Sequence, residues 1–257
     1  MSDHLTGFRA RLQAGPTAFA AWCAMREPAV AETILKEGFD CAVLDWQHGY
    51  HDQASIEAGI LIAQAYRKPA MVRIGVGDFA GAARFLDWGA VGIIAPMINS
   101  AADAKALVDF LKYPPLGSRS WGPMRAMGLT GLSNGEQLER ANDSSIVIAM
   151  IETREGFAAL DEILAVPGLD GVFVGPSDLS IALTNGATID PLYPEVDAAV
   201  QVIARKTRAA GKIVSAFCPD GKRSNELAKL GYTLLSVGTD GFLLRSAARA
   251  ELARAKG

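Results

Sequence analysis

The sequence of 257 residues has few cysteines and no excess of basic residues, and each of these absences excludes a class of protein. Its three cysteines, Cys23, Cys41 and Cys218, lie far apart and lack the paired spacing of a metal-binding motif. We therefore expect neither a disulfide framework nor a structural zinc site. The 25 basic and 28 acidic residues give a formal net charge of −3, so we expect no nucleic-acid partner.

Long apolar runs are absent as well. The apolar runs, residues 146–151 among them, are far too short to cross a bilayer. The first residues contain no apolar stretch of the length that a signal peptide needs. We expect no membrane partner and a location in the reducing cytoplasm.

What the sequence does contain is a regular alternation of short apolar runs with longer amphipathic stretches. The apolar runs predict eight strands, at residues 18–24, 41–45, 70–73, 91–95, 146–151, 171–174, 213–216 and 233–237. Helical spacing of apolar residues predicts helices between them, among them 29–37, 53–65, 101–111, 195–210 and 224–230. Eight such units in about 250 residues are typical of an α/β fold of the (β/α)8 TIM-barrel type. Because no linker interrupts the pattern, we expect a single domain over residues 1–257.

The competing fold for such a pattern is a doubly wound open sheet. A sheet of this kind normally carries a GxGxxG motif after its first strand, and no early predicted strand is followed by one.

One connection between the predicted strands is irregular. The connection over residues 113–142 is too long for a plain barrel loop, and we interpret it as an active-site cover or a subunit contact. Its Arg119 and Arg125 are candidates for binding the distal carboxylate of a long substrate.

Polar residues follow several predicted strands at the point where each strand ends. Asp45 ends the second strand and is followed by His48, Arg73 ends the third, Glu152 follows the fifth and Asp178 follows the sixth. Because the carboxyl ends of barrel strands meet at one rim, we expect these side chains to converge. Structural roles also stay open, for Asp178 as a helix N-cap and for Arg73 as half of a buried ion pair.

The two acids of this group favour a catalytic metal ion. Glu152 and Asp178 lie on neighbouring strands with no cysteine or histidine pair nearby. Oxygen ligands select a hard divalent ion such as Mg²⁺ or Mn²⁺, and two protein ligands leave positions open for a chelating substrate. Arg73 would then donate hydrogen bonds to an anionic oxygen close to the ion.

Five segments resemble a known family. They are LDWQHGYHD at 44–52, VRI at 72–74, IIAPMINSAADA at 93–104, MIETREG at 150–156 and GVFVGPSDLS at 171–180. Together they resemble the metal-dependent (class II) pyruvate aldolases of the 4-hydroxy-2-oxoheptanedioate aldolase and 2-dehydro-3-deoxyglucarate aldolase family. The resemblance implies a (β/α)8 barrel assembled as a homo-hexamer, a trimer of dimers that exchange the C-terminal helix. It also implies that Glu152 and Asp178 bind the divalent ion, which is Mg²⁺, Mn²⁺ or Co²⁺.

The same resemblance implies a role for each remaining candidate. Arg73 contacts the keto oxygen of pyruvate and stabilises its enolate, and His48 transfers a proton. Either Asp45 or Asp87 orients the histidine. The substrate carboxylate is received by the backbone of Gly175, Pro176 and Ser177, where a helix N-terminus presents unpaired N–H groups.

The implied function is a carbon-carbon lyase that cleaves or forms 4-hydroxy-2-oxo acids from pyruvate, or hydroxypyruvate, and an aldehyde. No predicted strand ends in a lysine, which counts against a Schiff-base aldolase. Two departures from the family, Gln47 where many members carry Glu and Met150 where some carry Gln, leave the aldehyde undetermined. The altered Gln47 also keeps open a related metal-enolate enzyme, such as a decarboxylase or a lyase like the citrate lyase β-subunit. A non-catalytic barrel that binds oxo acids is a further alternative, against which the intact candidate residues argue.

Overall fold

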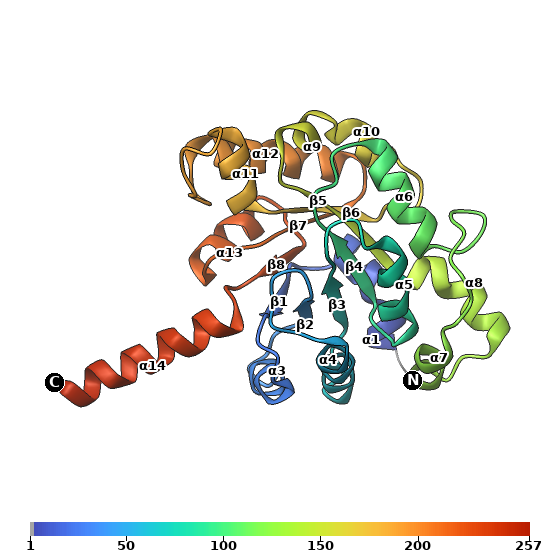
Figure 1. Cartoon of the computed structure of the whole chain (residues 1–257), viewed down its shortest axis with the longest axis horizontal. Helices are drawn as coiled ribbons and strands as arrows, with labels where there is room; N and C mark the ends of the chain where they lie inside the picture. Colours follow the sequence, from blue (N-terminus) through green and yellow to red (C-terminus); the bar gives the residue numbers. More distant parts are fainter. Residues whose placement is uncertain (1–2) are drawn as a thin grey trace.

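The structure is a computed structural model that describes residues 3–257, and its strands close into a barrel (Figure 1). The strands are β1 (Ala18–Cys23), β2 (Cys41–Asp45), β3 (Ala70–Arg73), β4 (Gly92–Ala95), β5 (Ile146–Ile151), β6 (Gly171–Val174), β7 (Ile213–Ala216) and β8 (Leu234–Ser236). Each strand pairs in parallel with the next, and β8 pairs with β1 to close the ring. The predicted (β/α)8 barrel is therefore confirmed.

Helices precede, connect and follow the strands. They are α1 (Asp3–Thr6), α2 (Phe8–Ala14), α3 (Pro28–Leu35), α4 (Gln53–Ala65), α5 (Phe79–Asp87), α6 (Ala101–Leu111), α7 (Met124–Thr130), α8 (Asn134–Ser144), α9 (Arg154–Ala158), α10 (Leu160–Leu164), α11 (Pro176–Leu183), α12 (Pro194–Ala209), α13 (Gly221–Lys229) and α14 (Asp240–Lys256). The last of them, α14, leaves the barrel and projects away from it (Figure 1). Within residues 3–257, no helix combines the length and the apolar character that a membrane span requires.

The alternation of side chains along each strand divides the core into two layers. Residues such as Ala42 and Leu44 of β2 point outward and pack with the surrounding helices. Cys41 and Val43 of the same strand point into the barrel, where they pack with the inward residues of the other strands. This period of two also fixes which residues at the carboxyl end of each strand point over the barrel interior.

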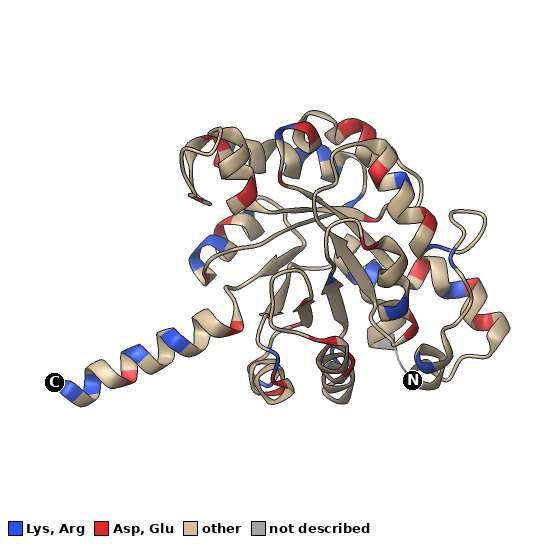
Figure 2. Ribbon diagram, in the orientation of Figure 1, with Lys and Arg blue, Asp and Glu red and all other residues tan. Residues whose placement is uncertain are grey.

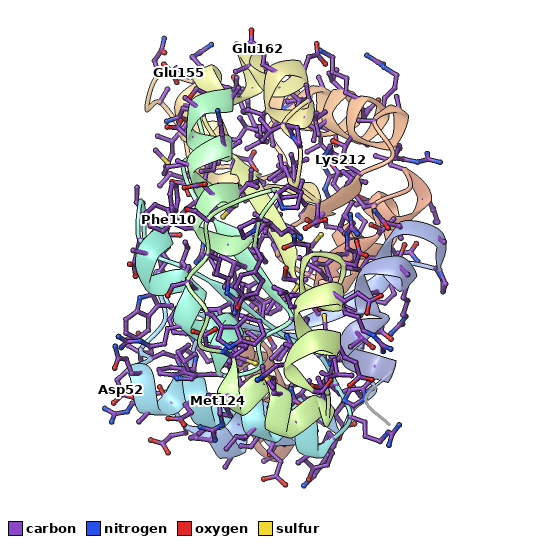
Figure 3. The ribbon with its side chains drawn as sticks, turned by 90° about the vertical axis from the view of Figure 1, so that its right-hand side faces the viewer. Asp52, Phe110, Met124, Glu155, Glu162 and Lys212 are labelled. Atoms are coloured by element: carbon purple, nitrogen blue, oxygen red, sulfur yellow. The ribbon has the colours of Figure 1, made fainter. Side chains whose placement is uncertain are left out.

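The long connection forms a side wall of the barrel. It contains α7 and α8, which pack against α5 and against the N-terminal helices α1 and α2. Its surface includes Met124, which is exposed and which Figure 3 shows together with Phe110 of α6 on the same side of the molecule. Within one chain the connection therefore braces the barrel wall, and the interpretation as an active-site cover does not hold for this chain alone.

Candidate active site

A cavity of about 330 Å³ lies at the carboxyl ends of the strands. Its lining residues are Trp22, Ala24, Asp45, His48, Arg73, Met150, Glu152, Gly175, Pro176, Ser177, Asp178, Phe217 and Thr239. Every candidate residue from the sequence except Asp87, Arg119 and Arg125 belongs to this set. No lysine lines the cavity, so nothing in it can form a Schiff base.

The centre of the cavity wall is an ion pair between Asp45 and Arg73. Arg73 donates from Nε to Asp45 Oδ1 at 2.9 Å and from Nη2 to Asp45 Oδ2 at 2.6 Å. The indole nitrogen of Trp22 donates to Asp45 Oδ2 at 3.2 Å, and the guanidinium carbon lies 4.9 Å from the centre of the Trp22 ring. The bidentate contact and the ring fix the guanidinium plane and leave Nη1 available to a ligand. Arg73 therefore does form the ion pair that the sequence left open as a structural role. The same pair also fixes Arg73 as a hydrogen-bond donor that faces the cavity.

Glu152 is the most deeply buried acid of the cavity, with a relative exposure of 2%. Its Oε1 accepts a hydrogen bond from the backbone N–H of Met97 at 2.8 Å. A Cβ atom at Gly175 would lie only 2.1 Å from Oε2 of Glu152, so only glycine permits this approach. Burial, together with the negative charge of Asp178, raises the pKa of Glu152 to about 7, although the Met97 hydrogen bond and the charge of Arg73 act in the opposite direction.

Asp178 lies in the first turn of α11 and lines the same cavity as Glu152. The N-cap of this helix is Gly175, and no side chain caps it, so the N-cap interpretation of Asp178 is wrong. Its carboxylate is solvent-accessible and lines the cavity. Because Pro176 occupies the first helical position, the N–H groups of Ser177 and Asp178 are the first unpaired donors of the helix, and they favour an anion.

His48 lies at the outer edge of the cavity. Its backbone N–H donates to Asp45 Oδ1 at 3.2 Å, which ties its position to the Asp45–Arg73 pair. The imidazole itself is exposed and has no hydrogen-bond partner within the described residues. By contrast, the ring of His51 contacts Ser55 Oγ and the carbonyl oxygen of Cys23, and this histidine holds two loops together. His48 is therefore the histidine that is available to a substrate.

Asp87 lies at the opposite end of the barrel. It ends α5, just before β4, and its Oδ1 accepts a hydrogen bond from Arg119 Nη2 at 2.6 Å. The prediction that Asp87 orients His48 is not met within one chain, because α5 ends at the amino ends of the strands. Asp45 contacts only the backbone of His48, so neither acid contacts the imidazole.

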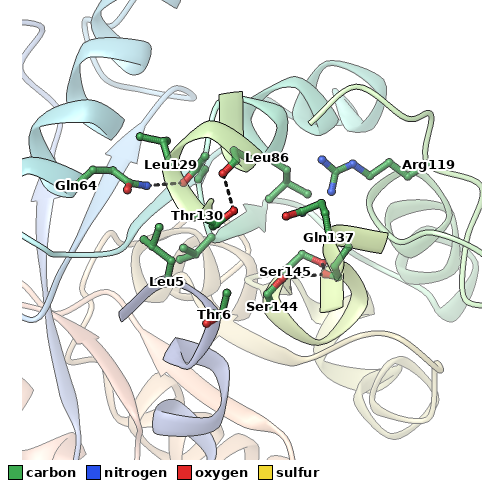
Figure 4. Close-up of a pocket in the computed structure, with 15 residues that line it drawn as sticks. Leu5, Thr6, Gln64, Leu86, Arg119, Leu129, Thr130, Gln137, Ser144 and Ser145 are labelled. Atoms are coloured by element: carbon green, nitrogen blue, oxygen red, sulfur yellow. Dashed lines mark hydrogen bonds between the residues drawn. The ribbon is translucent and has the colours of Figure 1, made fainter. Parts of the chain in front are cut away.

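The two arginines of the long connection also lie away from the active-site cavity. Arg119 borders a small cavity of about 50 Å³ between α1, α5, α7 and α8, at the amino ends of β4 and β5 (Figure 4). Its guanidinium is buried and lies 4.8 Å from the Tyr113 ring. Arg125 pairs with Glu57 of α4. Neither arginine of this chain can bind a substrate in the active-site cavity.

Sequence reasoning did not assign a role to several residues that shape the cavity. Trp22 packs with Phe217 at a ring distance of 5.4 Å, and together they form an apolar wall beside Arg73. Met97 has a positive φ of 57° and turns its N–H toward Glu152. The alternation within β1 signals that Trp22 points inward, but no sequence pattern signals the backbone turn at Met97.

The donor set of the cavity fits a divalent ion of the hard class. Glu152 and Asp178 offer carboxylate oxygens, whereas the carboxylate of Asp45 is occupied by Arg73. Within residues 3–257 no cluster of three or more His, Cys, Asp or Glu side chains has the arrangement of a closed metal site. Two carboxylate ligands leave coordination positions free on such an ion, and a substrate can occupy these positions. A bound cation would also stabilise the charged form of Glu152.

Comparison with known proteins gives consistent matches over nearly the whole chain. The family model described as HpcH/HpaI aldolase/citrate lyase matches residues 19–247. A protein of Pseudomonas aeruginosa named hydroxypyruvate/pyruvate aldolase is 35% identical, with 97% of this chain and 92% of that protein covered. A 4-hydroxy-2-oxo-heptane-1,7-dioate aldolase of Shigella flexneri is 32% identical over 96% of this chain and 92% of its own length. The crystal structure of an HpcH/HpaI aldolase/citrate lyase family protein from Burkholderia cenocepacia has a TM-score of 0.89 at 27% identity, covering 98% and 100% of the two chains.

The raised pKa of Glu152 predicts a stability difference in the metal-free protein. Between pH 4.5 and about 7 the folded state keeps a proton on Glu152 that the unfolded state has lost, so the free energy of unfolding falls as the pH rises. Glu152→Gln removes this loss of stability, and we expect it to stabilise the metal-free protein at pH 8 by about 3.5 kcal/mol, at about 1.4 kcal/mol for each unit between 4.5 and about 7.

Urea unfolding of the chelator-treated protein at pH 5 and pH 8 measures this difference. Glu155→Gln, which changes an exposed acid of α9, is the matched control and should leave the pH slope unchanged. An unchanged slope in Glu152→Gln would mean that burial does not hold a proton on Glu152.

Proposed function

The chain belongs to the HpcH/HpaI aldolase/citrate lyase family, and from this premise we propose that it is a carbon-carbon lyase of the class II pyruvate aldolase type. It cleaves and forms 4-hydroxy-2-oxo acids through the enolate of pyruvate or hydroxypyruvate. One observation carries this proposal: the fixed Arg73 guanidinium faces the same cavity as two carboxylates and a helix N-terminus. These are the groups that binding an oxo acid and stabilising its enolate require.

The cofactor in this proposal is a divalent ion, Mg²⁺, Mn²⁺ or Co²⁺, held by Glu152 and Asp178. When bound, such an ion supplies Lewis acidity to the oxo acid beside it. The close approach of the Gly175 backbone to Glu152 supports the assignment, because it keeps the carboxylate beside the helix that carries Asp178.

The chain's own residues bind and orient the oxo acid. The unpaired N–H groups at Ser177 and Asp178 receive its carboxylate. Arg73 donates from Nη1 to the keto oxygen, and this contact strengthens as negative charge develops there in the enolate. Asp45 is a positioning residue that prevents the guanidinium from rotating away. Trp22 and Phe217 exclude water from one side of the enolate.

His48 serves the aldehyde half of the reaction. In the cleavage direction it accepts the proton of the 4-hydroxyl group, and in the synthesis direction it returns that proton to the new alkoxide. Its exposed ring at the cavity edge supports this role, since the aldehyde must enter and leave there. An imidazole is suited to both steps because a ring nitrogen can accept a proton and later return it.

The first test of this proposal concerns the ion. Chelation is expected to abolish cleavage of a 4-hydroxy-2-oxo acid, and Mg²⁺, Mn²⁺ or Co²⁺ to restore it. Glu152→Gln and Asp178→Asn should each weaken Mn²⁺ binding by roughly 100-fold or more, because each removes one of two charged ligands. Calorimetric titration with Mn²⁺ alone measures the affinity, with Glu155→Gln as control. Wild-type Mn²⁺ affinity in either variant would place the ion elsewhere.

The second test separates the roles of Arg73 and His48 with two assays on each variant. One assay follows exchange of the pyruvate methyl protons with deuterated water, and the other follows carbon-carbon cleavage. Arg73→Lys keeps the charge but loses the planar fork, so both rates should fall by roughly 100-fold or more. His48→Ala should slow cleavage much more than proton exchange.

The outcomes of these two assays are distinct. An equal fall of both rates in His48→Ala would show that His48 removes the methyl proton itself. Normal rates in both assays would show that it takes no part in the reaction. For Arg73→Lys, a normal kcat with only a raised KM would reduce its role to substrate binding.

We also propose that residues 1–257 act as one domain and that the chain forms a homo-hexamer, a trimer of dimers that exchange α14. The helix contacts its own barrel near α3 and β1 and then projects from it. Its exposed apolar residues include Leu244 and Leu252, each with a relative exposure of 55%. An apolar face on a projecting helix is suited to packing against a second copy of the chain.

Sedimentation equilibrium tests this assembly. We expect the wild type to have six times the 27.1 kDa mass of one chain. Leu252→Asp introduces a charge into the apolar face and should lower the mass, because the charge loses water on packing. Arg254→Gln, on the same helix, is the control and should leave the mass unchanged. A monomeric wild type would contradict the assembly.

A further inference from the structure

Arg154 follows Glu152 by two residues but lies outside the active-site cavity, as the first residue of α9. Its side chain reaches α11, the helix that carries Asp178. There it donates from Nε to the carbonyl oxygen of Ala182 at 2.7 Å, and from Nη2 to the carbonyl oxygen of Leu183. Arg154 therefore binds the end of α11 that is opposite to the end lining the cavity.

The turn that follows β5 thus contacts α11 at both of its ends. At the start of the helix, the backbone of Gly175 approaches Glu152 so closely that a Cβ atom there would lie 2.1 Å from Oε2. No side chain caps this start. Because α11 has eight residues, its far end, where Arg154 binds, lies about 12 Å away. The acid and the arginine, two residues apart in the chain, together fix the position of the helix.

The C-terminal end of α11 has no cation of its own. The last carbonyl groups of a helix lack donors within the helix and carry partial negative charge. No lysine or arginine lies within α11, so the helix has no blue segment in Figure 2. The neighbouring α9, which packs against it, supplies Arg154 instead. The guanidinium provides both the missing donors and the positive charge that this helix end favours.

The start of α9 is itself tied to the loop that follows β4. Thr153 is the N-cap of α9, and its hydroxyl oxygen accepts a hydrogen bond from the N–H of Gly156 at 3.0 Å. The same hydroxyl group donates to Oδ1 of Asn99 in that loop. The loop also holds Glu152 through a backbone N–H. Arg154 therefore extends to α11 from a point that is fixed relative to Glu152.

We propose that Arg154 is a positioning residue that fixes where α11 places Asp178 relative to Glu152, and so sets the affinity of the site for its divalent ion. The proposal rests on the proposed function and deepens it, because it gives a residue outside the cavity control over the two metal ligands. Without Arg154, α11 can pivot at Gly175, and Asp178 moves together with the N–H of Ser177. A functional site tolerates displacements of only about 0.5 Å.

Calorimetric titration of the metal-free protein with Mn²⁺ alone tests the proposal. In Arg154→Gln, we expect the affinity for Mn²⁺ to fall by roughly tenfold or more, the loss that follows when a group supporting a metal ligand is removed. Arg154→Lys keeps the charge but loses the planar fork that reaches both carbonyl groups, so its affinity should be intermediate. Lys206→Gln is the matched control, because Lys206 of α12 pairs with Asp161 of α10 and does not contact α11 in this way.

Urea unfolding of the same variants with chelator separates positioning from general stability. We expect the midpoint urea concentration of Arg154→Gln to lie close to that of Lys206→Gln, whose Mn²⁺ affinity should equal that of the wild type. Wild-type Mn²⁺ affinity in Arg154→Gln, an equal loss in Lys206→Gln, or a loss seen only where the variant is unfolded would each overturn the inference. Failure of the proposed function is seen separately, as a wild type that binds no Mn²⁺.

Discussion

The bidentate ion pair between Asp45 and Arg73 is the contact on which the rest of the site depends. Their backbones are paired in register where β2 and β3 end, so the barrel itself brings the carboxylate and the guanidinium together. The pair is nearly buried, and breaking it by removing one partner would leave an uncompensated charge. Asp45 also accepts hydrogen bonds from the Trp22 indole and the His48 backbone, and so links the enolate donor, the apolar wall and the proton-transfer residue.

The alternation of side chains along each strand places the other cavity residues, Glu152 and Gly175 among them. Ile146, Ile148 and Met150 of β5 point into the barrel interior, and Glu152 is the next residue in that series. In β6 the inward residue Phe173 is followed two residues later by Gly175, which lines the cavity. A charged Glu152 at such a depth is costly to the folded state and favourable to a bound cation. The charged form of Glu152 thus lowers the stability of the metal-free chain and raises its affinity for the ion.

Much of this arrangement could be predicted from the sequence, because the strands are short apolar runs with clear ends. The bounds of β2, β3 and β5 agree with the prediction residue for residue, and this precision placed Asp45, Arg73 and Glu152 at one rim. Asp87 was grouped with them by resemblance, although the end of α5 lies at the other end of the barrel. The role of Met97 could not be predicted, since it depends on a backbone turn that no sequence pattern signals.

The central claim is that this cavity stabilises the enolate of an oxo acid bound beside a divalent ion. Proton exchange of pyruvate in deuterated water, followed by NMR with the wild type and no aldehyde, tests it most directly. The account predicts rapid loss of the methyl proton signal in the presence of Mg²⁺ or Mn²⁺, and no loss above the uncatalysed rate after chelation. Exchange that persists without a divalent ion, or a failure to exchange with one bound, would contradict it.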